Sequence, residues 1–215
     1  GQATRDYARE KQVLDRVRAG AVELGVAPDV AEQVMRLLIQ TSLTRQERAR
    51  VRAEGQGDGQ KALVIGGGGK MGRWFADFLD SQGYAVTIAD PVNTVEGFSC
   101  MADWRTAPDD FAVTVVAAPL KISAEILAQM AERAHAGLIF DIGSLKTPLV
   151  AALRKLAAGG ARVTSVHPMF GPDAQLLSGK HVLFLDAGCA EATRAARALF
   201  DSTMAQQTEM ELEEH

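Results

Sequence analysis

One histidine occupies a position that suits acid–base chemistry. His167 lies in SVHPMFGPD (165–173), directly after a short apolar run and directly before a proline. An imidazole titrates near neutral pH, so its unprotonated ring nitrogen can accept a proton from a substrate. Pro168 and Pro172 each fix their own φ and restrict the residue before them, which would hold the loop still. The residues alone leave two interpretations open: a proton acceptor, or a side chain that packs the loop.

A second polar loop is expected to lie close to this histidine. DIGSLK (141–146) carries Ser144 and Lys146 after an apolar run that predicts a buried strand. Ligands of parallel α/β sheets bind outside the carboxyl ends of the strands, so Ser144 and His167 should share one rim, where the hydroxyl can orient the imidazole. His135 falls at the end of a predicted helix and His181 at the start of a predicted strand, which favours capping or surface roles for both.

A glycine-rich loop between a strand and a helix predicts a dinucleotide site. IGGGGKMG (65–72) contains G-x-G-x-x-G as Gly67, Gly69 and Gly72. The first glycine permits a tight turn, the second lets the backbone approach a pyrophosphate, and the third lets the helix pack against the strand. The helix N-terminus then faces the phosphate charge. The alternative is a glycine turn that binds no ligand.

Asp90 extends this prediction to the ribose. It ends the second predicted strand, about twenty residues after the glycines, where a carboxylate can accept hydrogen bonds from a ribose 2′-hydroxyl. A carboxylate would repel a 2′-phosphate, so NAD is favoured over NADP; the alternative is a turn residue before Pro91. We expect Pro119 to shape the wall beside the nicotinamide. The predicted cofactor-binding residues are Gly67, Gly69, Lys70, Met71, Gly72, Asp90 and Pro119.

Alternating strands and helices must position these loops. Apolar runs predict strands over 61–66, 84–90, 111–119, 137–143, 161–167 and 181–187. Helical patterns fall between them over 70–83, 121–135, 147–157 and 190–205. Near-continuous apolar strands separated by helices predict a doubly wound, Rossmann-type and mostly parallel sheet covered on both faces. The stretch 92–110 is ambiguous, with one short strand at FSCM.

Residues 1–53 differ from the rest and have the pattern of two amphipathic helices. Asp29 with Glu32 resembles a capping box that opens the second helix. Two such helices bury too little apolar surface to fold alone, so they need another helix, a second chain or the following domain. Residues 54–60, EGQGDGQ, form a glycine-rich polar linker that marks a boundary before a domain over 61–208.

Composition argues against several classes of protein. The net charge of −4 and the lack of a long basic cluster argue against a nucleic-acid surface. The two cysteines, Cys100 and Cys189, have no metal or redox spacing, which indicates a reducing, cytoplasmic compartment. No apolar run is long enough to span a membrane, and nothing at the start of the given sequence resembles a signal peptide. The sequence begins with Gly and ends without a terminating feature, so we expect a fragment of a longer protein.

Three motifs together resemble the prephenate dehydrogenase family. GGGGKMGRWFADFLDSQGY, DIGSLK and HPMFGPD carry the resemblance, which extends over 61–215. It implies oxidative decarboxylation of prephenate to 4-hydroxyphenylpyruvate, with hydride transfer to NAD. His167 would accept the proton of the substrate hydroxyl, and Ser144 would orient the imidazole and touch the substrate. Lys146 and His215 would lie near the substrate, although an exposed strand-end position is an equal alternative for Lys146.

Residues 1–53 resemble the later part of an AroQ-type chorismate mutase. RDYARE resembles its Asp-x-x-Arg-Glu motif, and SLTRQ matches the Ser-x-x-x-Gln of its last helix. The implied task is electrostatic, since such a site grips the carboxylates and ether oxygen of chorismate. Each residue alone is better explained as a solvated helix residue, but the set in front of a dehydrogenase favours a site. The implied mutase residues are Asp6, Arg9, Glu10, Ser42 and Gln46.

The resemblance is incomplete at both ends. The long first helix of the mutase is absent, and residues 209–215 would only begin the C-terminal helical domain that forms a homodimer in the family. We therefore expect this chain to bind NAD but to turn over prephenate and chorismate poorly. Mutase before dehydrogenase is the order found in bifunctional enzymes of tyrosine biosynthesis. An arogenate or amino-prephenate dehydrogenase is an alternative, and a non-catalytic NAD-binding module is an alternative of another class.

Overall fold

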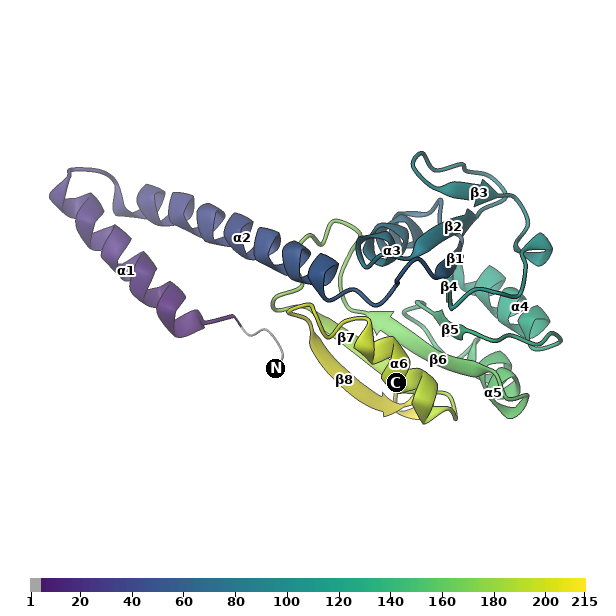
Figure 1. Ribbon diagram of the computed structural model, residues 1–215. Helices are drawn as coiled ribbons and strands as arrows, with labels where there is room; N and C mark the ends of the chain where they lie inside the picture. The colour runs from purple at the N-terminus through teal and green to yellow at the C-terminus, as the bar shows by residue number, and fades with distance from the viewer. Residues whose placement is uncertain (1–4) are drawn as a thin grey trace.

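The computed structural model describes residues 5–215 and shows a helical hairpin joined to an α/β body (Figure 1). Residues 1–4 of the predicted segment 1–53 lie outside the described residues. The hairpin projects from one side of the body. Among the described residues, no helix combines the length and apolar character needed to cross a bilayer.

The described part of the body is built on one eight-stranded sheet in the order β3-β2-β1-β4-β5-β6-β7-β8. Neighbouring strands are parallel except for β6 and β7, which are antiparallel. The chain moves outward from β1 in both directions, which confirms the predicted Rossmann-type, mostly parallel sheet. The strands are β1 (Lys61–Ile65), β2 (Ala85–Ala89), β3 (Ser99–Met101), β4 (Val113–Val116), β5 (Leu138–Asp141), β6 (Arg162–Pro168), β7 (His181–Asp186) and β8 (Gln206–Glu211).

Helices cover both faces of this sheet. On one face, α3 and α6 pack over a core that includes Phe75 and Phe200. On the other face, α4 and α5 pack over a core that includes Leu127 and Leu153. Strands buried on both sides need apolar residues at nearly every position, which is why their sequences show no alternation. The helices are α3 (Lys70–Ser81), α4 (Leu120–Met130), α5 (Val150–Ala158) and α6 (Ala190–Ala198).

The sequence does not predict one of these strands. The helix predicted over 190–205 stops at Ala198, and the chain then adds β8 beside β7. Because β8 is the edge of the sheet, most of its side chains are exposed and its sequence, QQTEME, is polar. The predicted boundary at 208 therefore falls inside a strand. The ambiguous stretch 92–110 contains the short strand β3 and a 3-10 helix at Trp104–Thr106.

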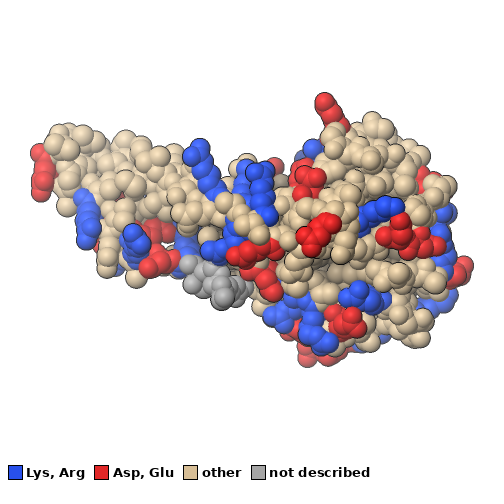
Figure 2. Space-filling model, in the orientation of Figure 1, with Lys and Arg blue, Asp and Glu red and all other residues tan. Residues whose placement is uncertain are grey.

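The hairpin consists of α1 (Tyr7–Glu23) and α2 (Pro28–Ala53), which confirms the two predicted helices. Few of its side chains are buried, with Leu14 and Ala21 as the apolar ones in α1. On the face shown in Figure 2, much of the hairpin surface carries neither acidic nor basic side chains. Its exposed large apolar residues include Val22, Leu24, Val26, Val30, Val34, Leu37 and Leu38.

The predicted capping box at Asp29 and Glu32 is wrong. The N-cap of α2 is Ala27, no side chain caps the helix, and Pro28 occupies its first turn. Proline suits that position because its φ is already helical and its missing N–H would have no partner there. Both acidic side chains accept hydrogen bonds from Nη1 of Arg18, each at 2.7 Å, and so join α2 to α1.

A buried carboxylate fastens α2 to the body. Glu47 is 5% exposed. Its Oε1 accepts a hydrogen bond from the backbone N–H of Leu177 at 2.8 Å, and its Oε2 accepts one from Met204 at 2.7 Å. Burial raises the pKa of this carboxyl group, while the two N–H donors oppose the rise. One turn further on, Val51 joins the core that contains Phe78.

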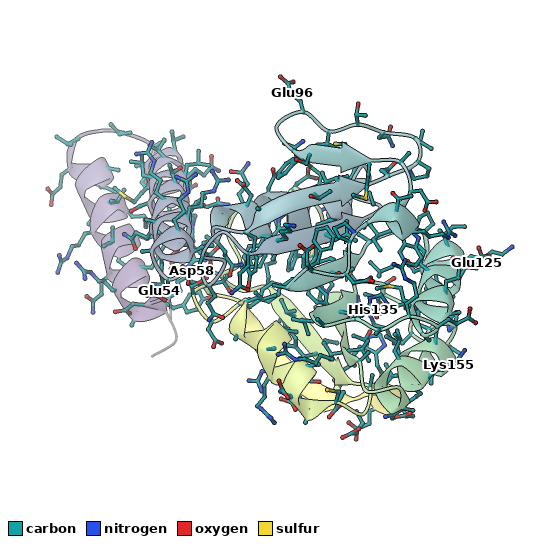
Figure 3. The ribbon with its side chains drawn as sticks, turned by 45° about the vertical axis from the view of Figure 1, so that its right-hand side comes forward. Glu54, Asp58, Glu96, Glu125, His135 and Lys155 are labelled. Carbon is teal, nitrogen blue, oxygen red and sulfur yellow. The ribbon has the colours of Figure 1, made fainter. Side chains whose placement is uncertain are left out.

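The glycine-rich segment 54–60 is held against the body by its backbone. Gly57 donates to Gln82, Gly59 donates to Gly83, and Gln60 accepts from Ala85. A Cβ on Gly57 would lie 2.3 Å from the backbone nitrogen of Tyr84, so close approach requires glycine there. Glu54 and Asp58 mark this junction in Figure 3. The segment is a fixed connection, and its glycines serve contact with the body.

Replacing Glu47 with alanine should destabilise the whole fold. The substitution leaves the N–H groups of Leu177 and Met204 without their acceptor. We expect the free energy of unfolding to fall by about 2–4 kcal/mol, since a buried donor without an acceptor costs about 1–3 kcal/mol. Urea denaturation followed by tryptophan fluorescence and circular dichroism would measure it. The exposed Glu54→Ala should change stability by less than about 0.5 kcal/mol; equal losses in both variants would contradict the prediction.

Candidate active site

The glycine loop joins the end of β1 to the start of α3. Gly66 has φ +81°, so the left-handed turn falls on this residue and not on the predicted Gly67. A Cβ on Gly72 would lie 2.3 Å from the carbonyl oxygen of Gly66, which confirms the predicted close packing of helix on loop. Gly69 is the N-cap of α3, and no side chain caps that end. The first N–H groups of α3, at Lys70 and the next residues, are therefore not occupied by a capping side chain.

Asp90 lies beside the glycine loop, at the end of β2. Its Oδ2 accepts a hydrogen bond from the N–H of Gly68 at 3.0 Å. Its Oδ1 accepts from Val92 at 3.0 Å and from Asn93 at 2.8 Å. The carboxylate therefore shapes the turn after β2, as one interpretation of the sequence requires. Its position next to Gly68 also places it where the other interpretation, ribose recognition, needs it.

Pro119 lies across the glycine loop from Asp90. It is the N-cap residue of α4 and follows β4. The neighbouring Ala117 donates its N–H to Ile65 of β1, and a Cβ on Gly66 would lie 2.7 Å from the nitrogen of Ala118. The carboxyl ends of β1, β2 and β4 thus form one continuous rim, and the predicted cofactor residues lie along it.

His167 lies further along the same rim, at the end of β6. Its Nδ1 is 2.8 Å from Nε2 of His215, and the two rings meet edge to face with centroids 5.0 Å apart. Burial lowers the pKa of His167 below its usual value, and Lys146 and His215 act in the same direction when they are protonated. The imidazole is therefore neutral at pH 7 and can accept a proton.

The expected contact between Ser144 and His167 is absent among the described residues. Ser144 is exposed in the loop after β5, and its hydroxyl makes no hydrogen bond to the imidazole. His215 takes that place, although 48 residues separate it from His167 in the sequence. β8 and a 3-10 helix at Leu212–Glu214 carry His215 to the rim, and Arg154 holds that helix through Glu213 at 2.6 Å.

A buried charge network lies beneath this histidine pair. Asp141 ends β5 and is fully buried. Its Oδ1 accepts from the hydroxyl of Ser165 at 2.5 Å, and its Oδ2 accepts from the N–H of Gly143 at 2.8 Å and from Nζ of Lys146 at 2.9 Å. The same Nζ donates to the carbonyl of Val166 at 2.9 Å. Every member of the network belongs to β5, β6 or the loop between β5 and α5.

Lys146 was expected either near the substrate or exposed at a strand end, and its ammonium group lies in neither place. The side chain is 3% exposed, so it is not a surface lysine, and its ammonium group points into the network instead of out to a substrate. Burial lowers its pKa, and the nearby carboxylate of Asp141 opposes that shift. Sequence reasoning missed Asp141 and Ser165. The available signal was an aspartate that ends a buried apolar strand, because a buried carboxylate requires partners.

The residues expected to form a mutase site are not brought together in the described chain. Asp6 caps α1 by accepting from the N–H of Arg9, while Glu10 accepts two hydrogen bonds from Arg5 at 2.6 Å. On α2, the side-chain amide of Gln46 lies 3.3 Å from the hydroxyl of Ser42. No hydrogen bond or ion pair within residues 5–215 joins the α1 group to the α2 group. Glu10 instead lines a groove whose other residues include Arg36, Arg45, Arg48, Asp173 and Lys180.

The other histidines have the structural roles expected of them. Nε2 of His135 lies 3.0 Å from the carbonyl of Met130 and so caps the end of α4. His181 is the exposed first residue of β7.

A glycine loop on the carboxyl rim of a Rossmann-type sheet, with an acidic residue after the second strand, defines a dinucleotide-binding domain. Sequence comparison identifies its kind. Residues 83–192, just over half of the chain, match "Prephenate dehydrogenase, nucleotide-binding domain". The chain belongs to the prephenate dehydrogenase family. Residues 1–47 match "Chorismate mutase type II".

Relatives share both parts. The T-protein of Enterobacter agglomerans is 29% identical over 187 residues, which are 86% of this chain and 47% of that protein. The T-protein of Haemophilus influenzae is 26% identical over 186 residues, which are 84% of this chain and 46% of that protein. The chain thus spans about half the length of these curated relatives. A crystal structure of a putative prephenate dehydrogenase from Corynebacterium glutamicum superposes with a TM-score of 0.55 at 16% identity, over 72% of this chain and 56% of that one.

Replacing Gly72 with alanine should disrupt the glycine loop. The added methyl group would overlap the carbonyl of Gly66, so the loop must shift and α3 must move away from β1. We expect a lower melting temperature and weaker binding of the dinucleotide, measured by differential scanning fluorimetry and by NADH fluorescence titration. Gly20→Ala is the matched control, since a Cβ there meets nothing within 4 Å. That substitution in α1 should be neutral or stabilising by about 0.5–1 kcal/mol. If Gly72→Ala behaves like this control, the packing argument fails.

Proposed function

We propose that the protein is an NAD-dependent prephenate dehydrogenase fused to a chorismate mutase, acting in tyrosine biosynthesis in the cytoplasm. The observation that carries the dehydrogenase assignment is the position of His167. Its imidazole lies on the ligand rim of a dinucleotide-binding sheet, and burial lowers its pKa. A neutral base next to a hydride acceptor is what oxidation of a secondary alcohol carbon needs. The names of the T-protein relatives support the fusion.

The residues present fit a bound dinucleotide. α3 begins at Gly69 without a capping side chain, so its N–H groups can receive a pyrophosphate. Gly67, Lys70 and Met71 border the same turn, and Asp90 stands beside Gly68 to receive the ribose hydroxyls. A 2′-phosphate would meet the carboxylate of Asp90, which favours NAD. When bound, NAD supplies the hydride acceptor.

The proposed chemistry divides the work between the histidine and the substrate. The ring carbon that carries the hydroxyl gives up its hydrogen as hydride, while His167 takes the hydroxyl proton as the carbonyl forms. The bond to the ring carboxylate then breaks, carbon dioxide leaves, and its electron pair restores aromaticity. The oxygen regains a proton from the imidazolium as the phenol forms. We propose that Ser144 contacts the substrate and that His215 positions the ring of His167, since it is the residue within hydrogen-bonding distance.

The mutase assignment concerns Asp6, Arg9, Glu10, Ser42 and Gln46. The match of residues 1–47 to a type II chorismate mutase supports it. Because α1 and α2 leave these residues apart, we propose that other helices of a longer protein or of a second subunit complete the site. The exposed apolar residues of the hairpin are consistent with such packing, and a homodimer is part of the proposal.

The deciding experiment compares wild type with His167→Asn in the full-length gene product. Loss of a general base should lower kcat for NADH formation from prephenate by about 10²- to 10⁴-fold, while NAD affinity changes little. His135→Asn is the matched control, because His135 lies just before the start of β5, at the end of the parallel strands away from the rim. A rate within a few-fold of wild type in His167→Asn would end the proton-acceptor assignment. Arogenate tested in parallel decides the substrate, and no rate with any substrate would leave only an NAD-binding module.

The pH profile gives an independent check. A histidine whose pKa is lowered stays neutral to lower pH, so the base remains active where an ordinary histidine would be protonated. We expect kcat/KM for prephenate to fall on the acid side with a midpoint below about pH 6.5, the ordinary value for histidine. Steady-state rates between pH 5 and 9 would test this. An acid limb centred above the ordinary histidine value contradicts the predicted environment of His167.

A further inference from the structure

The ammonium group of Lys146 is tied to the strand that carries His167. Nζ lies 2.9 Å from Oδ2 of Asp141 and 2.9 Å from the carbonyl oxygen of Val166, the residue directly before the histidine. The side chains of the lysine and the aspartate are 3% and 0% exposed. Burying two charges is costly, so such a pair persists only where hydrogen bonds satisfy both groups. The contacts to Val166, Ser165 and Gly143 meet that requirement.

The pair also controls the end of β6. Ser165 donates its hydroxyl to Asp141, and Val166 gives its carbonyl oxygen to Lys146, so two successive residues of the strand are held from β5 and its loop. His167 is the next residue. Its ring is therefore carried by a backbone that the buried pair fixes, while His215 contacts the ring itself.

We propose that Lys146 and Asp141 form a positioning pair for His167, which fixes the strand end that carries the imidazole and holds the lysine ammonium group close to it. The proposal rests on the proposed dehydrogenase function, in which His167 accepts a proton. It gives Lys146 a role different from binding substrate carboxylates, because its donors are directed at the protein interior.

The charges around His167 determine what each substitution should do. Lys146 from the loop after β5 and His215 from the 3-10 helix lower the pKa of His167, whereas Asp141 at the end of β5 raises it. The influence of Lys146 exceeds that of Asp141, and burial acts in the same direction as the lysine. On the neighbouring strand β7, the residue paired with His167 is the uncharged Leu183. Removing the lysine charge should therefore raise the pKa of His167, and removing both charges should raise it less.

The experiment compares three variants with wild type. Lys146→Met removes the charge, and the double variant Asp141→Asn/Lys146→Met removes both charges, so it avoids an unpaired buried carboxylate. Lys146→Arg keeps the charge but not the fit. Lys155→Met on the surface of α5, labelled in Figure 3, is the control and should match wild type.

Two readouts are needed, and one does not depend on turnover. Histidine-labelled NMR of this chain would follow the titration of the His167 ring. We expect its midpoint to rise in the order wild type, double variant, Lys146→Met, with Lys146→Arg close to wild type. In the full-length protein, the acid limb of kcat/KM should follow the same order. Loss of alignment should lower kcat by roughly 10- to 100-fold in Lys146→Met and Lys146→Arg, with a smaller change in the KM for prephenate.

The outcomes separate this proposal from the assignment of function. An unchanged His167 titration in Lys146→Met and in the double variant, or a loss confined to KM, overturns the positioning pair and leaves the dehydrogenase standing. If Lys146→Met does not fold, the double variant and Lys146→Arg decide the matter by the same criteria. A wild-type enzyme that does not oxidise prephenate overturns the proposed function, and the NMR order still decides whether the pair acts on His167.

Discussion

The carboxylate of Asp141 is the constraint on which the rim of the sheet depends. A buried negative charge is tolerated only with full hydrogen bonding, and here the partners come from two segments of the chain. Gly143 and Lys146 come from the loop after β5, and Ser165 comes from β6. The need to satisfy one group therefore draws the loop and the strand together. The shape of the rim beside His167 follows from electrostatics as much as from apolar packing.

Much of the fold could be predicted because its signals are local. Each central strand is covered on both faces, so it needs a continuous apolar run, and the loop at Gly72 needs glycine for a steric reason visible in its spacing. The edge strand β8 could not be found this way, since its exposed side gives no apolar pattern. The predicted capping box at Asp29 is wrong for another reason. The helix begins earlier, at Pro28, and the acidic side chains bind Arg18 of α1 instead of the backbone of α2.

The sequence predicts which residues lie at the strand ends of the site, but it predicts fewer of the contacts between them. His167 and Asp90 could be placed because strand order fixes which loops share an edge. The pairing of His167 with His215 depends on β8 and the turn after it, so no spacing in the sequence encodes it. The direction of Lys146 was missed because the partner that holds it, Asp141, looked like the last residue of an apolar strand. The motifs indicate which residues of the hairpin could belong to a mutase site, but the hairpin alone does not bring these residues together.

The junction at Glu47 and residues 54–60 bears on where this gene could be divided. The glycine-rich sequence suggests a place to separate the helical hairpin from the α/β body. A chain beginning at Lys61 would lose the acceptor for Leu177 and Met204 and would uncover the core surface that Val51 fills. The last turns of α2 pack on the α/β body and are hydrogen-bonded to it. The boundary that the glycine-rich sequence suggests and the boundary that the contacts of the chain indicate thus fall at different residues.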